Sequence, residues 1–151
     1  MFRLVWTSAI LIFCCVVPAI GQNSEKADIS VQSIQVEGMV GESLVYEIRE
    51  TIRESSGLNL VDSDQSYFRI IVSAMPKYEN NPATATIYSI QWVLYSEEEE
   101  ETGLPFLIDT TMGYCGSQAV ENSARNIAAR TDQLMSDIRQ YVRALEQQNR
   151  R

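Results

Sequence analysis

The residue with the most distinctive chemistry in this chain is Cys115, which lies between Tyr114 and Gly116. The sequence predicts that a long helix begins at Ser117, directly after this cysteine. Backbone N–H groups and the helix dipole at such a position stabilise an anion and can lower the pKa of a thiol. Three interpretations stay open: a small packed residue, a disulfide with another molecule, and a catalytic thiolate.

Few other residues of the chain indicate catalysis, because the chain contains no histidine. This absence excludes Ser–His–Asp triads, Cys–His dyads and His-ligated zinc sites. No carboxylate pair can be assigned to acid–base work. The run from Glu97 to Glu101 could hold a hard cation, but calcium loops alternate their ligands with small residues, so we interpret it as a charged hairpin tip. We therefore expect no enzymatic activity, no cofactor and no metal ion.

A site for a small ligand or a cation is the alternative function. Tyr88, Trp92 and Tyr95 lie on one predicted strand and could line the concave side of the predicted sheet. An exposed aromatic cluster would favour this interpretation, whereas a packed Trp92 would weaken it.

The first 21 residues predict export. Arg3 precedes an apolar run over residues 4–17, and the small residues Ala19 and Gly21 stand at positions −3 and −1 before Gln22. A cationic start, an apolar segment and small residues before the cleavage site form the pattern of a signal peptide. We expect cleavage before Gln22 and a mature protein in the periplasm or outside the cell.

The other two cysteines, Cys14 and Cys15, lie inside this signal. An uncleaved membrane anchor and a lipid anchor on one of these cysteines are the alternatives, although the apolar run is short and the residues before each cysteine fit acylation poorly. Cleavage would leave Cys115 as the single cysteine, which excludes a disulfide within the chain.

The chain is acidic, with a net charge of −8 that becomes −9 once Arg3 leaves with the signal. Such a charge argues against nucleic acid and anionic membrane as main partners. Basic residues gather near the C-terminus, where Arg139, Arg143 and Arg150 share one stripe. The stripe could dock on an acidic surface or on phospholipid headgroups, although cations are also favourable at a helix C-terminus without any partner.

Apolar periodicity divides the rest of the chain into two helices and four strands, which follow a flexible lead over residues 22–28. The predicted strands cover residues 29–36, 66–75, 84–95 and 104–112. The predicted helices begin near Glu42 and near Ser117, and the second spans about 28 residues, or about 40 Å. The order β-α-β-β-β-α predicts a single α+β domain over residues 29–148, a two-layer sandwich of a mainly antiparallel sheet with two helices on one face.

Three segments resemble the small periplasmic αβββα modules of cell-envelope accessory proteins: Leu44–Arg49, Ser56–Leu60 and Tyr67–Ile70. Such modules are the N-terminal domain of the Tol–Pal system's translocation protein, the curli secretion channel protein and the lipoprotein activators of penicillin-binding proteins. Val45–Arg49 and Gly113–Ser117 also resemble segments of small exported bacterial proteins of unknown role. The resemblance implies assembly and protein contact.

These observations together predict a non-enzymatic, exported accessory domain of the cell envelope. We expect it to bind a protein through its sheet edge or its final helix. The partner would be another envelope protein or a second copy of this chain, and the membrane would be contacted only through an uncleaved N-terminus.

Overall fold

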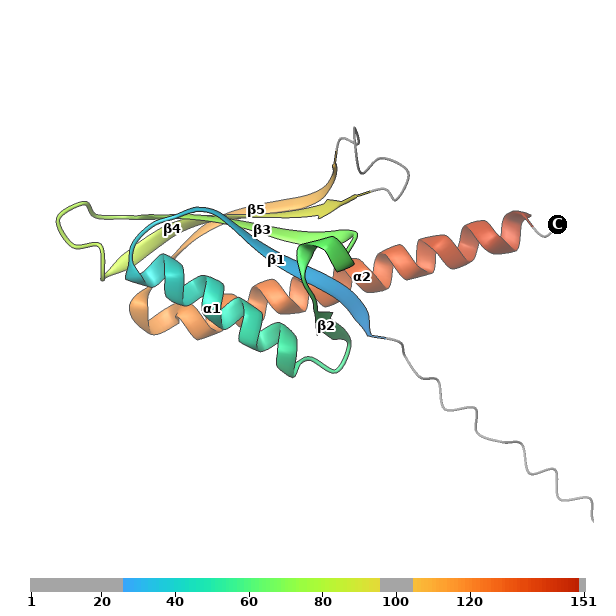
Figure 1. Cartoon of the computed structure of the whole chain (residues 1–151), viewed down its shortest axis with the longest axis horizontal. Helices are drawn as coiled ribbons and strands as arrows, with labels where there is room; N and C mark the ends of the chain where they lie inside the picture. The colour runs from blue at the N-terminus through green and yellow to red at the C-terminus, as the bar shows by residue number, and fades with distance from the viewer. Residues whose placement is uncertain (1–25, 96–104, 150–151) are drawn as a thin grey trace, which may run out of the picture.

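The computed structural model describes residues 26–95 and 105–149. Two α-helices lie on one face of a five-stranded sheet, which forms the two-layer α+β sandwich predicted from the sequence (Figure 1). The strands are β1 (Ala27–Val36), β2 (Leu58–Leu60), β3 (Phe68–Pro76), β4 (Ala85–Leu94) and β5 (Phe106–Gly116). The helices are α1 (Met39–Glu54) and α2 (Val120–Asn149), with short 3-10 turns η1 (Ser63–Gln65) and η3 (Ser117–Ala119).

The sheet runs in the order β2-β1-β3-β4-β5. β1 is parallel to both β2 and β3, whereas β3, β4 and β5 form the predicted antiparallel meander. The sequence missed β2, which has three residues and is therefore too short to show an apolar alternation.

Several predicted boundaries were wrong by a few residues. β1 begins at Ala27, inside the predicted flexible lead, because the Ala27 N–H donates a 2.9 Å hydrogen bond to the Gly57 carbonyl and the residue pairs with Leu58. α1 begins at Met39 rather than near Glu42. The predicted signal peptide, the start of the lead and the glutamate run at 97–101 lie outside the described residues.

The core lies between the helices and the sheet. α1 buries one apolar stripe against β1, β3 and β4, and the first half of α2 buries a second stripe. Each fully buried leucine or isoleucine contributes about 1.5–3 kcal/mol relative to an exposed side chain. Among the described residues, the largest side chains with less than 2 % exposure are Trp92, Ile29, Leu44, Ile48, Ile52, Leu58, Ile70 and Ile90.

α2 continues beyond the sheet toward the C-terminus (Figure 1). Its apolar stripe continues with it, since Tyr141, Val142 and Leu145 follow Leu134 and Ile138 at helical spacing. Leu134 is buried, whereas Tyr141, Val142 and Leu145 are exposed. The last turns of α2 therefore present an exposed apolar stripe. Within residues 26–95 and 105–149, no helix is both long and apolar enough to cross a membrane.

Replacing Gly38 with alanine will destabilise the domain. Gly38 precedes α1 with φ 80° and ψ 153°, a conformation that is essentially restricted to glycine, and an added Cβ would lie 3.0 Å from Pro76 Cγ. We expect the free energy of unfolding in urea to fall by about 1–3 kcal/mol. Gly116→Ala is the control, because its Cβ would meet only the Thr84 carbonyl oxygen at 3.6 Å. Equal losses in both variants would contradict this account.

Candidate functional site

Cys115 lies inside β5, opposite Thr86 of β4, and its side chain is 2 % exposed. The chain becomes helical at Ser117, as predicted, first as η3 and then as α2. Pairing with β4 carries the strand through Cys115 to Gly116, so the cysteine belongs to the sheet. Burial raises the pKa of the thiol, and a hydrogen bond involving Ser123 opposes that shift only in part. A buried, neutral thiol matches the interpretation of Cys115 as a packed residue. It matches neither a reactive thiolate nor a thiol that is accessible for a disulfide.

Alkylation of the native protein will therefore be slow. Iodoacetamide at pH 8 reaches Cys115 only when the core opens, so we expect modification to be about a hundredfold slower than in urea-unfolded protein. Mass spectrometry of quenched samples measures both rates. Similar rates in the two states would show that the thiol is accessible in the native fold.

The structure does not bring the three aromatic residues of the predicted ligand site together around one hollow. Tyr88 and Trp92 both border a small hollow of about 270 Å³ between β4, β5 and α2. Trp92 is 1 % exposed, and its Nε1–H donates a 2.8 Å hydrogen bond to Thr131 Oγ1 of α2. Tyr95 does not border this hollow; its ring lies 3.9 Å from the Arg69 guanidinium carbon. The packing of Trp92 weakens the predicted aromatic ligand site.

The described part of the basic stripe lies on the second half of α2. Arg139 is half-buried and Arg143 is exposed, one helical turn apart. Arg150 lies outside the described residues. The structure therefore describes two arginines of the predicted stripe beside the exposed apolar side chains of Tyr141 and Val142.

Exposed apolar side chains on the face of the sheet opposite the helices include a group that we call the outer patch: Met75, Ile87, Met112 and Tyr114. Met75 pairs with Ile87, and Ile87 pairs with Tyr114, so these side chains lie in one row across β3, β4 and β5. Met112 stands two residues before Tyr114 and shares its face. Lys77 Nζ lies 4.3 Å from the centre of the Tyr114 ring and places a positive charge at one end of the row.

The outer patch adjoins the free edge of the sheet. β5 is an edge strand of 11 residues, and β4 is its only strand neighbour among the described residues. Its single charged residue is Asp109, whose carboxylate accepts a 2.8 Å hydrogen bond from Arg130 Nε of α2. That bond lowers the pKa of Asp109. Natural edge strands are protected by charges or prolines, but the one charge of β5 is engaged with its own domain.

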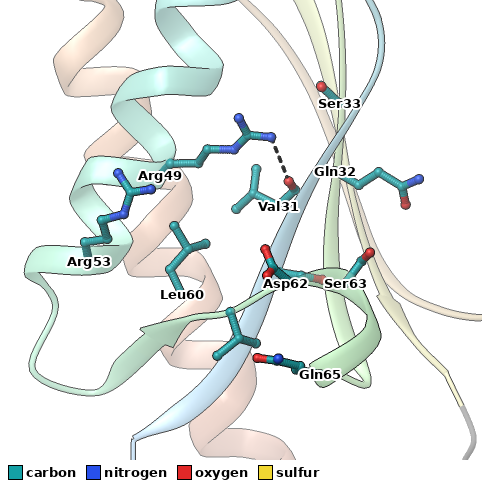
Figure 2. Close-up of a pocket in the computed structure, with 11 residues that line it drawn as sticks. Val31, Gln32, Ser33, Arg49, Arg53, Leu60, Asp62, Ser63 and Gln65 are labelled. Atoms are coloured by element: carbon teal, nitrogen blue, oxygen red, sulfur yellow. Dashed lines mark hydrogen bonds between the residues drawn. The ribbon is translucent and has the colours of Figure 1, made fainter.

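A second surface feature was not predicted from the sequence. A polar cleft of about 630 Å³ lies between α1, β1 and the segment over residues 60–65 (Figure 2). Arg49 and Arg53 of α1 border it, and Arg49 Nη2 donates a 3.1 Å hydrogen bond to the Val31 carbonyl. The i,i+4 spacing of the arginines was the only sequence signal. In the described part of the chain, no group of three or more acidic, cysteine or histidine residues is placed to hold a metal ion.

The sequence matches no protein-family model and no curated protein. Solved structures similar to the chain include a hypothetical protein from Chlamydia trachomatis, 10% identical over 74% of this chain and 99% of that chain, with a TM-score of 0.48. A dodecameric variant of PelC from Paraburkholderia phytofirmans is 12% identical over 72% of this chain and 87% of that chain, with a TM-score of 0.45. The rare lipoprotein B from Shewanella oneidensis is 14% identical over 79% of this chain and 98% of that chain, with a TM-score of 0.30. At these values the likeness identifies no family and brings no function to this chain.

Proposed function

We propose that this protein is an exported accessory domain of the cell envelope that works by binding another protein, without catalysis, through the edge of β5 and the outer patch. The observation that carries the proposal is the edge strand itself. β5 has 11 residues, one strand neighbour in the described structure, and a single charge that is paired within the domain. An extended segment of a partner adds to such an edge through main-chain hydrogen bonds.

The side chains around that edge support the same proposal. Leu107 and Met112 of β5 are exposed, as is Tyr114. Exposed tyrosine and methionine side chains are enriched in protein interfaces, where the aromatic ring supplies contact area at low entropy cost. The composition supports a non-catalytic role, because the absence of histidine removes the commonest general base. The signal-peptide pattern at residues 1–21 supports an envelope location.

Site-specific photo-crosslinking in the native host tests this proposal. A photoreactive phenylalanine analogue would replace Leu107 in one strain and Tyr46 of α1 in another, since both side chains are 60 % exposed. We expect a defined covalent adduct from position 107 and none from position 46. The mass of the adduct distinguishes another envelope protein from a second copy of this chain. Equal adducts from both positions, or none from position 107, would contradict the proposal.

A further inference from the structure

The polar cleft forms where the sheet is incomplete. In the described structure, β2 pairs with Ala27, Asp28 and Ile29 of β1, and no other described strand lies beside the next residues of β1 on that side. Residues 30–33 border the cleft there, with α1 on one side and residues 60–65 on the other. The Val61 N–H donates to the Ile29 carbonyl at 3.0 Å, and Arg49 donates to the Val31 carbonyl. Polar groups of both the main chain and the side chains therefore border this cleft.

Opposite charges line the two sides of the cleft. Arg49 and Arg53 lie on the side of α1, and Asp62 lies on the segment that follows β2 (Figure 2). Arg49 gives one hydrogen bond to the Val31 carbonyl, and a guanidinium has five N–H donors. Arg53 is paired with Glu50 on the exposed surface of α1. No ion pair engages the Asp62 carboxylate within the described residues.

The rest of the lining is largely polar. Gln32, Ser33, Ser63 and Gln65 add hydroxyl and amide groups to the border of the cleft. Ser30 also borders it, and its buried Oγ is without a hydrogen-bond partner in the described structure. Buried polar atoms almost always have a partner, and sites for small molecules occupy about 300–1,000 Å³. A cleft of about 630 Å³ with this lining suits a small polar ligand.

We propose that this cleft binds a small zwitterion of the amino-acid type, either a free amino acid or a short peptide. The ligand carboxylate would accept hydrogen bonds from Arg49 and Arg53, and its ammonium group would donate to Asp62. A simple anion would meet repulsion from Asp62, and a simple cation would meet repulsion from the arginines, so the arrangement favours a ligand that carries both charges. This site is separate from the β5 edge and does not depend on the proposed function.

Titration of the isotope-labelled protein with four probes, followed by amide chemical shifts in NMR spectra, tests the proposal. The protein is used as the cell produces it from the full chain, and the probes are trialanine, its N-acetyl form, its C-terminal amide and free alanine. We expect trialanine to shift amides within residues 30–33, 49–53 and 60–65. Loss of either charge should weaken binding about tenfold or more. Free alanine shows whether a single amino acid suffices.

Two substitutions separate recognition from folding. Asp62→Asn should weaken trialanine about tenfold and leave the N-acetyl form unchanged, because that form has no ammonium group to lose. Arg49→Met keeps the apolar stem and should weaken trialanine but not its amide. Asp64→Asn is the matched control, since Asp64 is also exposed but does not border the cleft. The proposal is overturned if trialanine shifts none of these amides, if capped and uncapped peptides bind equally, or if Asp62→Asn and Asp64→Asn behave alike.

Discussion

Changing Met112 to lysine will weaken capture of the protein partner by about thirtyfold or more, without unfolding the domain. Met112 is 75 % exposed on the outer patch, so the fold loses almost no buried surface when its side chain is changed. In a complex, however, a lysine at this position would place a charge against the buried centre of the interface. Hot-spot residues, which cluster near the centre of an interface, cost about 2 kcal/mol or more when they are truncated, which corresponds to about thirtyfold in Kd.

The chain offers a closely matched control for this substitution. Met39 is 69 % exposed at the first residue of α1, on the helix face of the domain. Met39→Lys therefore changes charge, side-chain volume and exposed apolar area in the same way on a different surface. Binding of the crosslinked partner to each purified variant, measured by biolayer interferometry, should be weak for Met112→Lys and unchanged for Met39→Lys. If both variants bind as tightly as the original chain, the outer patch is not part of the interface.

Replacing Trp92 with alanine will cause the largest loss of stability, about 3–5 kcal/mol. Trp92 is the largest fully buried side chain among the described residues, and it connects β4 to α2 through its hydrogen bond to Thr131 Oγ1. The substitution removes that bond and leaves a cavity between the sheet and the helix. Because domains of this size are stable by about 5–15 kcal/mol, the variant will lose a large part of its stability.

Urea unfolding followed by circular dichroism measures this loss, since removal of Trp92 also removes the main fluorescence signal. Thr131→Val isolates the hydrogen bond: it keeps the shape and leaves the indole N–H buried without an acceptor, at a cost of about 1–3 kcal/mol. Tyr141→Ala truncates another aromatic residue that is 67 % exposed on α2, and should cost less than about 1 kcal/mol. Similar losses for Trp92→Ala and Tyr141→Ala would show that Trp92 is not a core residue.

The predictable part of this fold is the part whose apolar residues repeat. The alternation through Tyr88, Ile90 and Trp92 predicted β4, and the helical stripe from Val120 to Leu145 predicted α2. Both patterns are long enough for the period to be unambiguous. β2 was not predicted because three residues are too few to show an apolar period. Only its pairing with β1 identifies it as a strand.

The candidate sites were harder to predict because they depend on contacts between distant segments. The helix that begins after Cys115 could be predicted, but the burial of the thiol depends on the pairing of Cys115 with Thr86 of β4. The polar cleft combines Arg49 of α1 with Asp62, and only the packing of α1 against the sheet brings these charges to one recess. The edge position of β5 likewise follows from strand order, which apolar periodicity does not specify.

Hydrogen exchange of the backbone amides of β5, with and without the crosslinked partner, tests the proposed function most directly. Main-chain pairing with an added strand would slow exchange within Phe106–Gly116. We expect this protection in β5 and no change on the exposed face of α1. Unchanged exchange in β5, with new protection elsewhere on the domain, would contradict the assignment of this edge as the binding surface.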